Sequence, residues 1–153
     1  MNVHFRLIPE AIATSDASSK AGVLADLAGR FEHAYGFAAA DVLEALEERE
    51  KLGSTGFGRA VAIPHARLAH VNRPVAALLK LSAPVEFHSA DGMPVELAFG
   101  LISPENAGAA HLHALAAISR MMREETVHRM LMEATDAETL RASLANASDR
   151  DVA

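Results

Sequence analysis

The stretch Gly56 to His70 reads GFGRAVAIPHARLAH, and in it a short apolar run ends in Pro64 and His65. A histidine at such a place can pack in a core, ligate a metal or act as a nucleophile. If the site binds an anion, arginines would neutralise its charge. The candidate cations are Arg49, Arg59 and Arg67. The residues alone leave a structural histidine, an anion site and a nucleophile open.

Other chemistries find little support. His111 and His113 form an HxH pair, but on a helix their side chains diverge by about 200° and cannot share one ion. The segment GSTGFGR lacks the GK[ST] ending of a P-loop, and Ser54 is not part of a GxSxG elbow. We therefore expect no metal and no cofactor, and neither nucleotide hydrolysis nor serine hydrolysis.

The composition and charge of the chain limit its possible partners and chemistry. The chain has 153 residues, a formal charge of -6 and no cysteine. The negative charge disfavours nucleic acid and anionic lipid as partners, and the lack of cysteine excludes disulfides and thiolate chemistry. The N-terminus has no signal-peptide pattern, and no run of about 18 apolar residues could cross a membrane. We expect one cytoplasmic domain over residues 1–153.

Two amphipathic helices are predicted before the histidine. The first has Asp16 and Ser18 as possible caps and should end at Gly36. The second is predicted over residues 39–51 and should stop at Gly53. Its apolar stripe continues one turn later onto Arg49, which should lie at the rim of the buried face. Arg49 could lay its stem along the core with a solvated head, or it could face an anion.

Short strands are predicted at about residues 11–14, at residues 60–63, where Pro64 should close the strand, and at residues 75–81 and 95–102. Three helices should follow. The first starts at about residue 109, has Ser103 and Asn106 as possible caps and turns one face inward. The residues expected on that face are Leu112, Leu115, Ile118 and Met122.

The second of these helices is expected over residues 126–133. The last begins at a capping box made by Thr135 and Glu138 and buries Leu140 and Leu144. Helices before and after a central group of strands predict an α/β fold, a mixed sheet with helices on both faces.

Four ordered motifs carry a family resemblance: EREKLGSTGFG, AIPHARL, DGMPVELAFGLISP and HLHALAAIS. From about Leu7 to Leu144 the chain resembles the enzyme IIA domain of the mannitol/fructose type in the bacterial phosphotransferase system. Among its members, the chain is most similar to the free-standing nitrogen-regulatory ones. The resemblance implies a three-layer α/β/α sandwich.

The resemblance also implies residue roles. His65, the histidine of AIPH, would be the phosphoryl acceptor, with His111 beside it and Arg49 close by. Ser54, Thr55, Arg59 and Arg67 are then candidates for a phosphate loop or for docking of the donor. One segment departs from the family, since Arg59 and Ala60 occupy the place of the usual Asn-Gly.

The implied activity is that of a phosphocarrier, a phosphotransferase-type protein with a phosphohistidine intermediate. An HPr-like protein would be the donor, and regulatory proteins such as a sensor kinase, a potassium transporter or a stringent-response enzyme would be the targets. Two alternatives stay open: a sugar-specific IIA component that passes the phosphoryl group to a separate IIB protein, and a binding module that is not phosphorylated.

Overall fold

The computed structural model describes residues 3–152, with side chains over residues 3–146. Its core is a mixed sheet with strand order β1-β5-β6-β3-β2, in which β4 also pairs with β6. The strands are β1 (Ile12–Ser15), β2 (Gly56–Gly58), β3 (Val61–Ala62), β4 (His65–Leu68), β5 (Val75–Val85) and β6 (Val95–Pro104). The helices are a 3-10 turn at Pro9–Ala11, α1 (Lys20–Tyr35), α2 (Ala39–Lys51), α3 (Ala109–Arg123), α4 (Glu125–Glu133) and α5 (Ala137–Val152).

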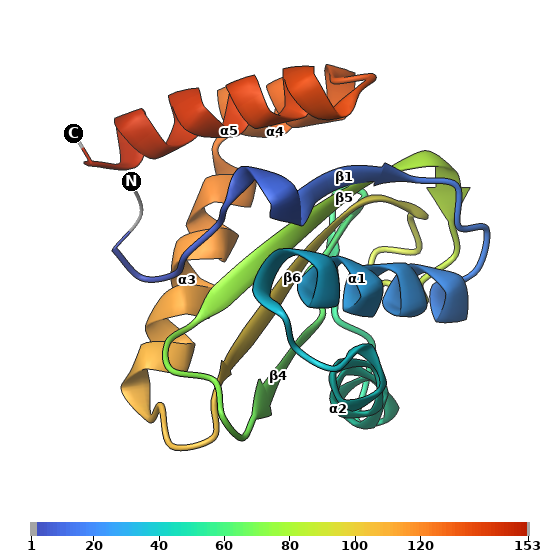
Figure 1. Ribbon diagram of the computed structural model, residues 1–153. Helices are drawn as coiled ribbons and strands as arrows, with labels where there is room; N and C mark the ends of the chain where they lie inside the picture. The colour runs from blue at the N-terminus through green and yellow to red at the C-terminus, as the bar shows by residue number, and fades with distance from the viewer. Residues whose placement is uncertain (1–2, 153) are drawn as a thin grey trace.

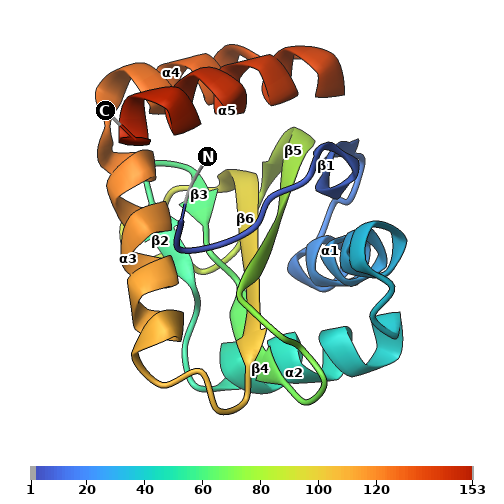
Figure 2. The same ribbon diagram turned by 60° about the vertical axis from the view of Figure 1, so that its left-hand side comes forward.

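Helices cover both faces of the sheet. α1 and α2 lie on one face, α3 lies on the other, and α4 and α5 run across one end (Figures 1 and 2). Each face has its own apolar cluster, because alternate residues of β5 and β6 point in opposite directions. Leu101 packs in the cluster under α3, whereas Ile102 packs in the cluster under α1 and α2. The predicted three-layer α/β fold is confirmed.

β6 organises the site, because three strands lie against it. β5 pairs with it antiparallel, while β3 and β4 pair with it parallel, one after the other along its length. β6 is buried almost throughout. The long apolar run therefore predicted a central strand correctly.

The prediction that the strand ends before Pro64 is confirmed, since β3 ends at Ala62, but the chain does not leave the sheet there. Pro64 has no N–H to donate, so the ladder is interrupted after Ala62. Its carbonyl oxygen nevertheless accepts a hydrogen bond of 2.9 Å from the Leu101 N–H, which keeps the chain on β6. His65 therefore opens a new strand, β4, where it is paired with Leu101.

Several helix caps also differ from prediction. Ser19, not Asp16 or Ser18, caps α1 by accepting a hydrogen bond from the Gly22 N–H at 3.0 Å. α3 starts after Gly108 without a side-chain cap. At α5, Asp136 accepts from the Thr139 N–H at 2.7 Å. In segments rich in Ser, Thr and Asp, only the path of the chain decides which side chain reaches a free N–H.

The predicted ends of α1 and α2 are confirmed. Gly36 ends α1 in a left-handed conformation, and α2 spans Ala39–Lys51 as predicted, with Leu52 at its C-terminus. On α3 the predicted buried face is wrong for Leu112, which is 61% exposed, because His111 occupies the buried position beside it. Leu140 and Leu144 are buried as predicted.

No helix of the part described is long and apolar enough to span a membrane.

Candidate functional site

His65 lies in a shallow depression of about 600 Å³ between the end of α2, the start of β4 and the start of α3. Its polar lining residues are Glu48, Arg49, His65, Arg67 and His111. Four candidates from the sequence thus meet in one place, although they come from three elements far apart in the chain.

The imidazole of His65 is held by two hydrogen bonds. Its Nδ1 lies 2.7 Å from the carbonyl oxygen of Ile63. A carbonyl can only accept, so Nδ1 carries the proton in the neutral ring. Nε2 therefore has the lone pair, and it accepts a hydrogen bond of 3.2 Å from the Nε–H of Arg49. The ring presents one unprotonated nitrogen beside one guanidinium.

The environment keeps this ring neutral. Burial lowers the pKa of His65 below its usual 6.5, and the charge of Arg49 lowers it further. The hydrogen bond to Ile63 and the charge of Glu50 raise the pKa, but they are outweighed. A neutral imidazole nitrogen is nucleophilic, whereas a protonated one is not.

Arg49 reaches His65 from the last turn of α2. Its Nη1 donates a hydrogen bond of 2.9 Å to the Gly53 carbonyl oxygen, just beyond the end of the helix. A cation is favoured there because the helix dipole ends in free carbonyls. With Nη1 anchored on Gly53 and Nε on His65, the guanidinium plane is fixed beside the imidazole.

Glu50, the neighbour of Arg49, ties this helix end to the rest of the molecule. Its side chain is 6% exposed and forms an ion pair of 2.9 Å with Lys20 at the start of α1. The same carboxylate accepts hydrogen bonds from the backbone N–H and the hydroxyl of Thr55. Because these contacts fix the end of α2, they also fix the position of Arg49.

His111 is the third residue of α3 and is 6% exposed. Its ring centroid is 5.6 Å from that of His65, and its Nδ1 is 2.7 Å from the Oγ of Ser103. Burial, Arg67 and His65, in that order, lower the pKa of His111 to about 4. The neutral ring therefore stands at a helix N-terminus, where free N–H groups and the dipole favour an anion.

Ser54 and Thr55, two candidate phosphate-loop residues, have structural hydrogen bonds. The Ser54 hydroxyl donates to the Phe87 carbonyl oxygen at 2.5 Å. Thr55 is buried and bound to Glu50. Neither side chain lines the depression around His65.

Arg59 also points elsewhere. Its guanidinium forms an ion pair of 2.6 Å with Glu125 at the start of α4. Its backbone N–H donates to Asp91 at 3.0 Å, and its carbonyl oxygen accepts from Nε2 of His128 at 2.8 Å. These contacts hold the tight turn between β2 and β3, at a distance along the sheet from the depression.

Three groups at the site are not predicted from the sequence: the Ile63 carbonyl oxygen, the Glu50 carboxylate and the Ser103 hydroxyl. No residue pattern marks a carbonyl as a partner for a histidine two residues later. The sequence predicts Ser103 as a possible helix cap, but Ser103 belongs to β6. Glu50 resembles the exposed glutamates that precede it in α2.

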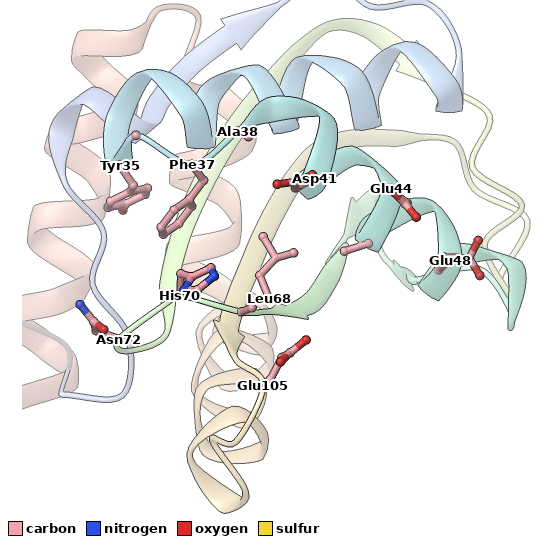
Figure 3. Close-up of a pocket in the computed structure, with 13 residues that line it drawn as sticks. Tyr35, Phe37, Ala38, Asp41, Glu44, Glu48, Leu68, His70, Asn72 and Glu105 are labelled. Atoms are coloured by element: carbon pink, nitrogen blue, oxygen red, sulfur yellow. The ribbon is translucent and has the colours of Figure 1, made fainter.

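A larger groove of about 760 Å³ runs along α2 beside Tyr35 and His70 and shares Glu48 with the depression (Figure 3). The charged residues that line it are Asp41, Glu44, Glu48 and Glu105. Four carboxylates would repel an anionic ligand. The smaller depression, with Arg49 and Arg67, is therefore the one suited to a phosphoryl group.

Among the described residues, no group of three or more His, Asp or Glu side chains could hold a metal ion.

Comparison with known proteins agrees with the geometry. The family model for the phosphoenolpyruvate-dependent sugar phosphotransferase system, EIIA 2, matches residues 7–147. A nitrogen regulatory protein of Bradyrhizobium diazoefficiens is 40% identical over 138 residues, which is 90% of each chain. One of Pseudomonas aeruginosa is 47% identical over 104 residues, 68% of each chain.

Solved structures show the same fold. The crystal structure of nitrogen regulatory protein IIA-Ntr from Neisseria meningitidis superposes with a TM-score of 0.81 at 37% identity, over 90% of this chain and 95% of that one. Mannitol IIA from Escherichia coli has a TM-score of 0.76 at 20% identity, over 92% of this chain and 99% of that one.

The fold and the matched family define a phosphotransfer protein. The chain belongs to the EIIA type 2 family of the phosphoenolpyruvate-dependent phosphotransferase system.

Proposed function

We propose that the protein is a regulatory phosphocarrier in which Nε2 of His65 accepts a phosphoryl group from the phosphohistidine of an HPr-like protein. The observation that carries this proposal is the pair of hydrogen bonds on His65. Nδ1 is protonated and bound to Ile63, so Nε2 is the nitrogen free to attack, and Arg49 is already beside it.

The transfer needs no general base. The lone pair of Nε2 forms the new N–P bond while the N–P bond of the donor breaks, and its electron pair returns to the donor imidazole. The proton stays on Nδ1 of His65 throughout, hydrogen-bonded to the Ile63 carbonyl oxygen, and this oxygen stabilises the positive charge on the phosphorylated ring. The protein's part is alignment of the nitrogen and neutralisation of charge.

Arg49 supplies much of that neutralisation. Its Nε–H now donates to Nε2 and would turn to a phosphoryl oxygen once the N–P bond forms. A hydrogen bond between a guanidinium and a phosphoryl oxygen is charge-assisted and is strong in a partly buried site. Arg67 lines the same depression and adds a second positive charge.

The regulatory role is supported by the relatives. Those 40% and 47% identical are named nitrogen regulatory proteins. Phosphorylation would add nearly two negative charges to a surface that proteins can contact, which is enough to create or abolish binding of a target. Sensor kinases, potassium transporters and stringent-response enzymes are the target classes to test, in the cytoplasm.

A sugar-specific role is the second candidate, since a relative from Haloferax volcanii named as a fructose-specific EIIA component is 36% identical over 67% of each chain. In that role His65 would pass the phosphoryl group to a IIB protein. The chemistry at His65 is the same, so only the acceptor distinguishes the two functions.

The decisive experiment is reconstitution with Enzyme I, an HPr-type carrier and phosphoenolpyruvate, followed by mass spectrometry for an acid-labile phosphate. We expect one phosphoryl group in the wild type and in His113→Ala, a control that removes an exposed histidine of α3. His65→Ala should carry none. An unlabelled wild type would refute the phosphocarrier function and leave the binding-module alternative. A labelled His65→Ala protein would instead refute His65 as the acceptor.

Labelled protein then separates the two roles. Incubation with a fructose- or mannitol-type IIB protein should leave the label on His65 if the role is regulatory. Rapid transfer to IIB, at a rate comparable to loading from the HPr-type carrier, would instead assign the sugar-specific role.

A further inference from the structure

We propose that Ser103 is a positioning residue: its hydroxyl donates to Nδ1 of His111 and so holds the proton of that ring on Nε2, facing the group bound to His65. The role of this proton toward a phosphoryl group on His65 rests on the proposed function, whereas the tautomer of His111 does not.

The placement of Ser103 follows from strand register. Leu101 and Ser103 point to the same face of β6, the face that α3 covers, because side chains alternate along a strand. On the neighbouring strand, His65 is paired with Leu101 and Arg67 with Ser103. The serine therefore lies at the buried edge of the depression, under the first turn of α3.

The direction of the hydrogen bond follows from burial. Ser103 is 0% exposed, and its Oγ has one side-chain hydrogen bond within the part of the chain described, the bond of 2.7 Å to Nδ1 of His111. If Nδ1 were the donor, the hydroxyl proton would be buried without an acceptor. If Nδ1 accepts, both groups are satisfied, and buried polar groups in proteins are nearly always satisfied.

The other nitrogen of His111 has the opposite surroundings. Nε2 has no hydrogen-bond partner among the described residues. It is not fully buried either, since the buried polar atoms without a partner are in other residues. Nε2 is therefore accessible to solvent in the depression that His111 lines. A proton on Nε2 is solvated in the free protein, so the tautomer that satisfies Ser103 leaves no group of this ring unpaired.

The tautomer matters because a phosphoryl oxygen only accepts hydrogen bonds. With the proton on Nε2, His111 can donate to a phosphoryl group on His65, whose ring centroid is 5.6 Å away. With the proton on Nδ1, it would present a lone pair to that group and repel it. Since the His111 ring is neutral, its tautomer alone decides whether it attracts or repels the phosphoryl group.

The direct test is nitrogen NMR of the unphosphorylated protein labelled with ¹⁵N-histidine. At neutral pH we expect the His111 signals of a neutral ring with the proton on Nε2. In Ser103→Ala the population of the Nδ1–H tautomer should rise, while Ser143→Ala, which removes another buried serine hydroxyl far from the site, should leave the His111 signals unchanged. A wild-type ring protonated on Nδ1 would overturn the proposal.

The kinetic test uses the same variants. Loading of His65 from the HPr-type carrier should be about two- to tenfold slower in Ser103→Ala than in Ser143→Ala, the range expected for one neutral hydrogen bond. Ser103→Thr, which keeps the hydroxyl, should restore the tautomer and the rate together. Equal rates in the two alanine variants would refute the positioning role, whereas absent loading in the wild type would refute the phosphocarrier function and leave the tautomer result intact.

Discussion

The Nε–H of Arg49 donates a hydrogen bond of 3.2 Å to Nε2 of His65, so a cation and a nucleophilic nitrogen are in contact before any phosphoryl group arrives. This contact favours an unprotonated Nε2, because a protonated Nε2 could not accept from Arg49. It also requires Arg49 to change partner during the reaction, which makes this residue the first to test.

Arg49→Ala should slow phosphorylation of His65 by about 10²-fold, the effect typical of removing one preorganised charge-stabilising donor. Arg49→Lys should recover only part of the rate, since an ammonium group cannot bind His65 and Gly53 through a planar fork. The measurement is the rate of loading from a phosphorylated carrier, and Arg120→Ala, exposed on α3, is the matched control. Unchanged kinetics in Arg49→Ala would leave this arginine a purely structural role.

The pH dependence of the transfer should reflect the lowered pKa of His65. The rate should stay constant as the pH falls to the usual histidine pKa of 6.5 and should decline only below it, because Nε2 must be unprotonated to attack. In Arg49→Ala the decline should begin at a higher pH, since one cause of the lowered pKa is removed. A decline that begins at the same pH in both proteins would contradict this electrostatic role of Arg49.

Stability should also fall in acid because of His111. The pKa of this histidine is about 4 in the folded protein and near 6.5 in the unfolded chain, so the unfolded state gains its proton first as the pH falls. The contribution of the neutral ring is fully present above pH 6.5 and is lost as the pH falls toward 4. It amounts to roughly 1 to 3 kcal/mol.

Urea unfolding between pH 4 and pH 7 measures this slope. His111→Gln, which does not titrate in this range, should flatten the curve, whereas the exposed control His33→Gln should not. His65 retains a lowered pKa in both variants, so a smaller slope of the same sign will remain. A curve as steep in His111→Gln as in the wild type would be inconsistent with a buried neutral ring.

The turn between β2 and β3 carries backbone strain. Arg59 and Ala60 have φ values of 57° and 69°, and they join Gly58 to Val61, which are paired across the two strands. A two-residue hairpin turn of this kind favours Asn-Gly, because left-handed backbone is costly for residues with a Cβ. The family's usual Asn-Gly suits this geometry. In this chain Arg59 and Ala60, which both have a Cβ, adopt it instead.

Ala60→Gly should therefore raise the free energy of unfolding by about 0.5 to 1 kcal/mol. Relief of about 1 to 2 kcal/mol of strain exceeds the roughly 0.8 kcal/mol lost with one buried methyl group. In the control Ala76→Gly, a buried position of β5 with ordinary backbone, the same deletion should destabilise. Calorimetric melting of both variants gives the sign of each change in the free energy of unfolding. An equal loss of stability in the two variants would show that the turn at Ala60 is unstrained.

Local pattern was enough for much of the framework. The apolar stripe and terminal glycine of α1, the bounds of α2, and the buried runs of β5 and β6 all follow from periodicity and from residues with strong backbone preferences. These features depend on neighbours within a few residues, so the sequence alone determines them. The four ordered motifs likewise predict the family and the candidate acceptor His65.

The tertiary structure decided which candidates meet. Arg59 and Arg49 look equally available in the sequence, but Arg59 is paired with Glu125, 66 positions later, while Arg49 contacts His65. Ser103, predicted as a possible cap, is a strand residue that is hydrogen-bonded to His111. Pairing of β4 with β6 brings these groups together, and long-range register leaves no trace in local periodicity. Local sequence pattern thus predicts most elements and singles out His65 as the candidate acceptor. The packing of α2 and α3 around β6 places Arg49 and His111 beside His65, and Ser103 beside His111.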